Sequence, residues 1–224
     1  MAARMTDDSA RRANAPDARA YWNSIYTRTV QNENSWYQLE PTRSLELLAD
    51  LGIGPDSAII DVGGGDSTLV DALVGRYMAR VTVLDISGVA LERAQRRLGA
   101  HANNVEWIES DVRTATLQAR AYDVWHDRAV FHFLTEREDR QRYIETATRS
   151  IAPGGAMVLA TFGSDGPRSC SGLPVVRFGA DTLASEVGNE FELVRALTED
   201  HRTPRGDAQH FLYAVFRRAE TRDT

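Results

Sequence analysis

The chain has 224 residues, enough for one domain, and its 42% hydrophobic and 26% charged residues are typical of a globular protein. All 26 of its Lys or Arg residues are arginines. The absence of lysine excludes Schiff-base chemistry, a Walker-type phosphate site and the Tyr-x-x-x-Lys pair of short-chain dehydrogenases. The formal net charge of -6 argues against a broad nucleic-acid surface, because clustered positive charge is what binds phosphates.

The single cysteine, Cys170, cannot form an internal disulfide, and one thiol is too few for a cysteine-based zinc site. No His, Cys or carboxylate cluster has metal-ligand spacing, so the sequence predicts a protein without a metal. Residues 1–20 lack an apolar signal segment, and the chain has no run of about 20 apolar residues to span a membrane. We therefore expect a cytoplasmic protein with a disordered tail at residues 1–20 and no nucleic-acid or membrane partner.

From residue 42 onward, short apolar strands alternate with amphipathic helices. The predicted elements, in chain order, are a helix at 42–51, a strand at 58–62, a helix at 67–74, a strand at 81–84, a helix at 89–98, strands at 105–108 and 122–125, a helix from 135 to 151, a strand at 156–162, a short helix at 181–187 and strands at 191–197 and 210–217. Thr135 and Glu138 form a predicted capping box for the fourth of these helices, and Pro153-Gly154-Gly155 ends it.

This alternation predicts an α/β fold with a doubly wound, mostly parallel sheet and helices on both faces. The last two strands are joined by a polar loop and form a hairpin, so they are expected to be antiparallel. With no repeat and no break in composition, we predict a single domain over residues 21–218, followed by a C-terminal tail at 219–224.

Acidic residues and glycines stand where the predicted strands end, which is where doubly wound sheets bind nucleotide-like ligands. The segment 61–66 reads Asp-Val-Gly-Gly-Gly-Asp at the end of the first strand. Asp85 ends the second strand, in the position of an acid that accepts hydrogen bonds from both ribose hydroxyls. Asp111 follows the third strand and is expected to approach an adenine edge.

Thr68 stands where the dinucleotide fingerprint has its third glycine, so a pyrophosphate-binding turn and a nicotinamide-dependent oxidoreductase are disfavoured. The pattern favours a ligand that carries adenosine without phosphate. S-adenosylmethionine is such a ligand.

Over residues 21–218 the chain resembles the class I (Rossmann-like) S-adenosylmethionine-dependent methyltransferases. The resemblance rests on the glycine motif at 60–65, a ribose motif at 83–87, an adenine motif at 110–112 and a Pro-Gly-Gly turn at 151–155. It implies a seven-stranded sheet of order 3-2-1-4-5-7-6. The cofactor-binding residues that it implies are Trp36, Asp61, Gly63, Gly64, Gly65, Asp85, Ile86, Asp111 and Val112. One departure is Ser67, which stands where this family usually has the last glycine of its first motif.

Two subgroups of the family share local features with the chain. Tyr21-Trp22 and Ser35-Trp36-Tyr37 resemble an aromatic N-terminal segment of certain protein-lysine methyltransferases. The segment 125–129, Trp-His-Asp-Arg-Ala, is similar to the Trp-Asp-Arg-Gly segment of the thiopurine S-methyltransferase group, and this similarity implies that Arg128 lies near the methyl acceptor. The aromatic residues between 22 and 37 are expected to form a lid over the cofactor, with plain core packing as the alternative.

The candidate catalytic residues are His126, Asp127, Arg128 and His132. A general base is needed only where the nucleophile arrives protonated, because the sulfonium already activates the methyl group. Structural alternatives stay open: Asp127 can cap the segment after it or pair with Arg128, and the apolar neighbours of His132 are typical of a core histidine.

We therefore expect in-line methyl transfer to a small-molecule nucleophile. A protein-lysine N-methyltransferase is the first alternative, and a non-catalytic cofactor-binding protein is the second. Methylation of adenine in DNA is disfavoured because segment 126–129 replaces the Asn/Asp-Pro-Pro-aromatic loop of such enzymes. Whether oxygen, nitrogen or sulfur is methylated does not follow from the sequence.

Overall fold

The computed structural model describes residues 17–220, and the rest of the predicted tails lies outside these residues. The first helix is α2 (Ala18–Arg28), and the side chain of Asp17 caps it by accepting a 3.0 Å hydrogen bond from the backbone N–H of Arg19. The prediction of a disordered tail up to residue 20 is therefore wrong for Ala18–Ala20. The reason is the Asp17 cap together with Tyr26, which the helix buries further along.

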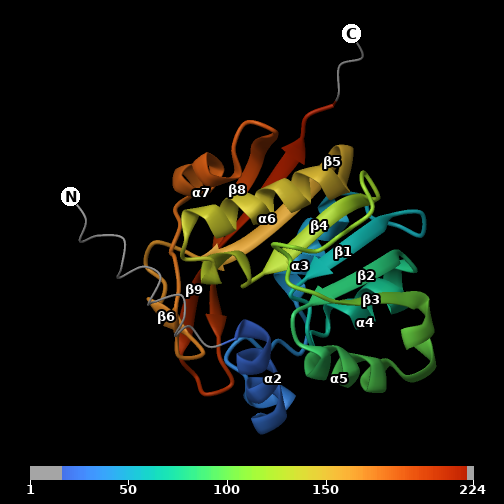
Figure 1. Ribbon diagram of the computed structural model, residues 1–224, viewed down its shortest axis with the longest axis vertical. Coiled ribbons are helices and arrows are strands. Elements are labelled where there is room, and N and C mark those ends of the chain that lie inside the picture. Colours follow the sequence, from blue (N-terminus) through green and yellow to red (C-terminus); the bar gives the residue numbers. More distant parts are fainter. Residues whose placement is uncertain (1–16, 221–224) are drawn as a thin grey trace, which may run out of the picture.

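Seven strands form one sheet in the order β3-β2-β1-β4-β5-β9-β8 (Figure 1). Their bounds are β1 (Ala58–Val62), β2 (Arg80–Asp85), β3 (Val105–Glu109), β4 (Tyr122–Arg128), β5 (Ile151–Phe162), β8 (Phe191–Arg202) and β9 (Ala208–Arg218). The first five strands are parallel, and β9 runs antiparallel to both β5 and β8. The predicted fold class, sheet order and terminal hairpin are confirmed. A small hairpin of β6 (Ser169–Cys170) and β7 (Leu173–Pro174) stands apart from the sheet.

The remaining α-helices are α3 (Thr42–Asp50), α4 (Leu69–Ala72), α5 (Gly88–Leu98), α6 (Arg137–Ser150) and α7 (Ala180–Val187). Helix α4 continues into a π-helical turn at Leu73–Tyr77. The predicted capping box is wrong, because α6 begins after Glu136 and its N-cap makes no side-chain hydrogen bond. The guanidinium of Arg140 instead holds the carbonyls of Leu134 and Thr135 outside the helix, each at 2.9 Å. Strand β5 also begins earlier than predicted, since Ile151 already pairs with Tyr122.

Alternate residues of each central strand enter two hydrophobic cores, one on each face of the sheet. Ile60 and Trp125 join the core that includes Tyr143 of α6, whereas Ile59 belongs with Leu48 of α3 on the opposite face. Because both faces are covered, the carboxyl ends of the parallel strands are the place left for a ligand. No helix within residues 17–220 is long and apolar enough to cross a membrane.

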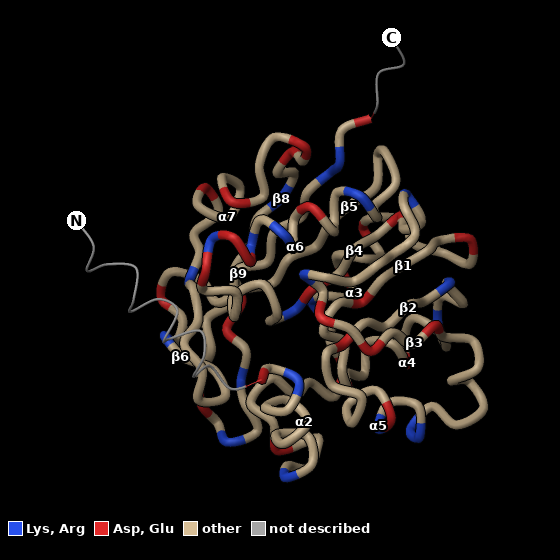
Figure 2. The backbone as a smooth tube through the Cα atoms, in the orientation of Figure 1, with Lys and Arg blue, Asp and Glu red and all other residues tan. Residues whose placement is uncertain are grey.

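Acidic and basic residues are interspersed along the surface helices (Figure 2). Several of them join neighbouring elements: Arg97 of α5 lies 2.7 Å from Asp71 of α4, and Arg140 of α6 lies 2.9 Å from Glu186 of α7. These partly exposed pairs each contribute little to stability, but they link the helices that frame the strand ends.

Candidate active site

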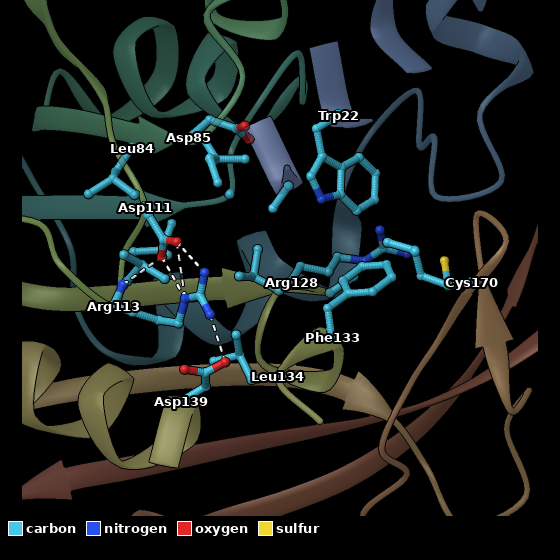
Figure 3. Close-up of a pocket in the computed structure, with 18 of the residues that line it drawn as sticks. Trp22, Leu84, Asp85, Asp111, Arg113, Arg128, Phe133, Leu134, Asp139 and Cys170 are labelled. Carbon is cyan, nitrogen blue, oxygen red and sulfur yellow. Dashed lines mark hydrogen bonds and ion pairs between the residues drawn. The ribbon is translucent and has the colours of Figure 1, made fainter. Parts of the chain in front are cut away.

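A cavity of about 240 Å³ lies at the carboxyl ends of β1 to β4, and it is called the main cavity below. Its strand side is formed by predicted cofactor residues: Gly63, Asp85, Ile86, Asp111 and Val112. Its other side carries the aromatic rings of Trp22, from α2, and Phe133 (Figure 3). Tyr26 of α2 and Trp36 of the following loop also line it. The sheet thus gathers at one cavity residues that lie far apart in the sequence.

The glycine segment after β1 forms a sharp bend against this cavity. Gly63 and Gly65 have φ angles of 66° and 49°, which favour glycine. An ideal Cβ on Gly65 would lie 2.6 Å from the hydroxyl of Tyr26, and one on Gly63 would overlap Val130. Of the two, Gly63 lines the cavity and Gly65 lies against Tyr26. The bend therefore presents bare backbone at the first strand end.

Asp85 is a buried carboxylic acid in the wall of the main cavity. Burial raises its pKa to about 7. The backbone N–H of Ser87, which donates a 2.8 Å hydrogen bond to Oδ1, partly opposes this rise. The group therefore changes between its neutral and ionised forms near neutral pH.

Asp111 also lines the main cavity, but its carboxylate is already engaged. The guanidinium of Arg113 binds both oxygens, and the same guanidinium reaches Asp139 at 2.6 Å. Burial opposes ionisation of Asp111, yet the hydrogen bonds from Arg113 lower its pKa below the usual value. A ligand at this wall meets an ion-paired cluster, a feature that the sequence analysis missed although Arg113 is only two residues away.

A second, smaller cavity of about 50 Å³ lies behind the glycine bend, between the tips of β1 and β4 and the first turn of α3. It is lined by the predicted residues Asp61, Gly64 and His126, together with Ser44 and Asp66. Four residues line both cavities and form the partition between them: Tyr26, Trp36, Gly63 and Arg128.

Arg128, in this partition, is held by neutral groups alone. Its Nε donates to the hydroxyl of Tyr213 at 3.0 Å, its Nη1 donates to the carbonyl of Trp36 at 2.9 Å, and its guanidinium lies 4.6 Å from the centre of the Phe211 ring. Its Nη2 is buried and has no hydrogen-bond partner among the residues that the structure describes. Within residues 17–220 no carboxylate forms an ion pair with it, so Arg128 is an uncompensated cation beside both cavities.

Residues 59–155 match the family model described as "Methyltransferase domain". This match supports a class I S-adenosylmethionine-dependent methyltransferase domain. It is 31% identical over 118 residues to an uncharacterized methyltransferase of Mycobacterium tuberculosis, a match covering 53% of this chain and 55% of that relative. It is 27% identical over 124 residues to nodulation protein S of Rhizobium tropici, covering 55% and 50%. The chain therefore spans about half the length of the curated relatives it matches.

The methyltransferase fold is also found in the N-methyltransferase NodS of Bradyrhizobium japonicum, solved with S-adenosyl-L-homocysteine. The TM-score is 0.67 at 21% identity, with 88% of this chain and 98% of that chain covered. At this identity the likeness concerns the fold. The specific resemblance to the thiopurine S-methyltransferase group gains no support from the comparisons.

Asp127 was a candidate base, but in the methyltransferase domain it supports the turn after β4. Its Oδ1 accepts from the backbone N–H of Val130 at 2.8 Å, and its Oδ2 accepts from Phe131 N–H at 3.0 Å and from the Tyr143 hydroxyl at 2.7 Å. Burial raises its pKa to about 6. Asp127 lines neither cavity. Its side chain therefore caps the segment after it, which was the structural alternative from the sequence.

His132 and His126 also lie away from the main cavity. His132 is buried; Nδ1 accepts from the backbone N–H of Phe162 at 3.2 Å, and burial, with the nearby charge of Arg128, lowers its pKa to about 3. It is a neutral core histidine. His126 faces the smaller cavity instead, where it contacts Asp61 and Ser44. Of the four candidate catalytic residues, the structure therefore brings only Arg128 to the main cavity.

Proposed function

We propose that this protein binds S-adenosylmethionine in the main cavity and transfers its methyl group to a small-molecule acceptor. The observation that carries the proposal is the meeting of the glycine bend, Asp85 and Asp111 at one cavity, beside a wall of aromatic rings. The chain fits such a ligand. Gly63 presents backbone to the cavity, Asp85 lines it, and aromatic faces attract a sulfonium cation.

The cofactor supplies a methyl group that is already activated by the positive charge on sulfur. The residues of the chain then have to bind the cofactor and the acceptor, orient them and exclude water. Asp85 is suited to accept from ribose hydroxyls, and Trp22, Trp36 and Phe133 cover the cavity. Trp22 makes edge-on contacts with the other two rings, whose centroids lie 6.0 Å and 5.1 Å away. These contacts support the predicted aromatic lid.

The acceptor is proposed to be anionic where it contacts Arg128. A buried guanidinium nitrogen without a partner costs free energy until an acceptor atom reaches it, and no carboxylate within residues 17–220 supplies one. The neighbouring wall is apolar, with Phe133, Cys170 and Leu173. An anionic nucleophile, such as a carboxylate or a thiolate, arrives without a proton and needs no general base. This agrees with the positions of Asp127 and His132.

A protein lysine is the less favoured acceptor. The Arg128 cation at the cavity repels an approaching ammonium group, and the described structure offers no carboxylate paired with Arg128 to offset this charge. A protein that binds the cofactor without catalysis is the other alternative, and only turnover distinguishes it from an enzyme.

Two measurements test the proposal. Calorimetry is expected to detect binding of S-adenosylmethionine and S-adenosylhomocysteine and no binding of a nicotinamide dinucleotide; the reverse result would overturn the cofactor assignment. Incubation with methyl-labelled S-adenosylmethionine and a native extract is then expected to place the label in the small-metabolite fraction. Label confined to a protein band would contradict the small-molecule acceptor, and absence of any product would support the non-catalytic alternative.

The role of Arg128 is tested with Arg128→Met and Arg128→Lys. Both variants are expected to reduce the labelling of the metabolite, with the lysine variant less affected because it keeps the charge but loses the planar guanidinium. Affinity for S-adenosylhomocysteine is the control. Equal losses of cofactor binding and of turnover would assign Arg128 to the cofactor rather than to the acceptor.

A further inference from the structure

Three buried polar side chains form a continuous chain from α3 through β4 to β1. His126 Nε2 lies 2.9 Å from the Oγ of Ser44, and its Nδ1 lies 2.8 Å from Oδ1 of Asp61. Ser44, His126 and Asp61 are 1%, 2% and 3% exposed, so their hydrogen bonds are shielded from water. Asp61 and His126 are also direct neighbours in the pairing of β1 with β4.

The direction of these hydrogen bonds follows from the groups involved. A carboxylate oxygen only accepts, so His126 Nδ1 is the donor to Asp61. In a neutral ring Nε2 is then an acceptor, and the hydroxyl of Ser44 donates to it. The imidazole is thus held at both ends, and Oδ1 of Asp61 is held by the imidazole.

The other oxygen of Asp61, Oδ2, has no hydrogen-bond partner in the part of the chain that the structure describes. It is buried without a hydrogen bond, and Asp61 lines the smaller cavity. Gly64 has no side chain to crowd this carboxylate, since an ideal Cβ there would lie 2.6 Å from Oδ2. Asp66, a second acid, lines the same cavity, and its nearest ion-pair partner, Arg93, is 3.6 Å away. A buried carboxylate oxygen without a hydrogen-bond donor costs free energy. A ligand that places a donor in this cavity would remove that cost.

We propose that His126 and Ser44 are positioning residues that aim Oδ2 of Asp61 at a cationic amine in the smaller cavity. This inference rests on the proposed function: with S-adenosylmethionine bound, we assign the amine as the α-amino group at the methionine end of the cofactor. Gly63 lines both the smaller and the main cavity, so we expect one ligand to extend from one cavity into the other. His126, a candidate for catalysis by sequence, thereby acquires a role in binding.

Two ligands that differ only at this end test the proposal. S-adenosylhomocysteine carries the amino-acid group, whereas 5′-methylthioadenosine has the same nucleoside and sulfur without it. His126→Leu is expected to weaken S-adenosylhomocysteine binding by about tenfold or more, because the charge-assisted hydrogen bond between Asp61 and the amine loses its alignment. Binding of 5′-methylthioadenosine is expected to change by less than about twofold. His126→Asn keeps a donor near the Nδ1 position and is expected to restore most of the affinity.

Ser44→Ala is the milder variant, and it keeps the test decisive where His126→Leu fails to fold. It is expected to show the same selectivity for S-adenosylhomocysteine with a smaller loss, and this loss is expected to disappear in an Asp61→Asn background because the effect passes through Asp61. His210→Leu is the matched control, since His210 makes another His–Asp contact of 2.8 Å with Asp200 on the terminal hairpin.

Equal weakening of both ligands by the Ser44 and His126 variants, or weakening of neither, would overturn the positioning role. That outcome differs from failure of the proposed function, in which the unmodified protein itself binds neither ligand. An analogue of S-adenosylhomocysteine without its amino group gives the last check. Its affinity is expected to be the same in the unmodified protein and in His126→Leu, and a tenfold difference would assign His126 to another part of the ligand.

Discussion

The backbone N–H of Ser87 donates a 2.8 Å hydrogen bond to Asp85 where β2 ends and α5 begins. The hydroxyl of Ser87 is used as well: it accepts from the backbone N–H of Ala90, as the cap of α5, and lies 2.7 Å from the side-chain oxygen of Asn23 in α2. Ser87 therefore links Asp85, in the wall of the main cavity, to both α5 and α2. This arrangement keeps Asp85 in place without neutralising it.

The first prediction concerns pH and cofactor binding. The pKa of Asp85 is raised to about 7 by burial, and the ionised form is the better acceptor for ribose hydroxyls. Protonation therefore competes with binding, and the dissociation constant for S-adenosylhomocysteine is expected to rise by about tenfold between about pH 8 and about pH 6. Calorimetry at several pH values measures it, with Asp85→Asn as the control. The variant is expected to bind more weakly and with little pH dependence, and an unchanged pH profile in the variant would contradict the assignment.

The second prediction concerns the partition between the two cavities. Gly63→Ala places a Cβ where Val130 Cγ2 now lies and adds the strain of a positive φ. The free energy of unfolding is expected to fall by roughly 2–4 kcal/mol, with loss of cofactor binding. Val130→Ala in the same chain removes the overlapping methyl group and is expected to recover part of the stability, as measured by urea unfolding. No recovery would show that the strain, and not the overlap, dominates.

The third prediction separates a structural from a catalytic role for Asp127. Asp127→Asn replaces one of the two oxygens that accept hydrogen bonds from the backbone N–H groups of Val130 and Phe131 and from the hydroxyl of Tyr143, so stability is expected to fall by about 1–3 kcal/mol. Binding of S-adenosylhomocysteine by the folded variant is expected to be unchanged. Full stability combined with abolished turnover would instead support the original hypothesis of a general base.

The fourth prediction uses the raised pKa of the same residue. Because the pKa of Asp127 in the folded state, about 6, lies above its unfolded value, the folded state holds the proton more tightly. Its contribution to stability is therefore present at low pH and is lost as the pH rises from about 4 to about 6. The stability difference between the unmodified protein and Asp127→Asn is expected to shrink across this range in urea titrations. A difference that is constant with pH would refute the assignment.

The fifth prediction concerns the aromatic cover. Trp22 contacts Tyr26 as well as the two rings described above, and its own ring lines the main cavity. Trp22→Ala opens the cavity to water and is expected to weaken S-adenosylhomocysteine binding by roughly tenfold or more. Trp22→Phe keeps a ring and serves as the matched control. If both variants bind as tightly as the unmodified protein, the aromatic cover contributes no binding free energy.

Local patterns were sufficient to predict the architecture. Continuous apolar runs such as 58–62 belong to strands buried on both faces, and their alternation with amphipathic helices leaves few topologies for a parallel sheet. For the same reason, residues at or just after the strand ends gather at one place: Gly63, Asp85 and Asp111 all line the main cavity. Boundaries were less predictable. The start of α6 depends on hydrogen bonds from Arg140, a residue inside α6, to the carbonyls of Leu134 and Thr135 just before the helix.

The sequence by itself therefore determined the fold and the edge of the sheet where polar groups gather, because strand and helix periodicity are local properties of the chain. Only the tertiary structure decided what each polar side chain does there. His126, Asp127 and Arg128 are consecutive, yet one binds Asp61, one supports a turn and one is a cation without a carboxylate partner among residues 17–220. Side chains alternate across a strand, and their partners come from α3, α6 and β9, far away in sequence. The role of a buried polar group is set by those partners, and a sequence pattern does not contain them.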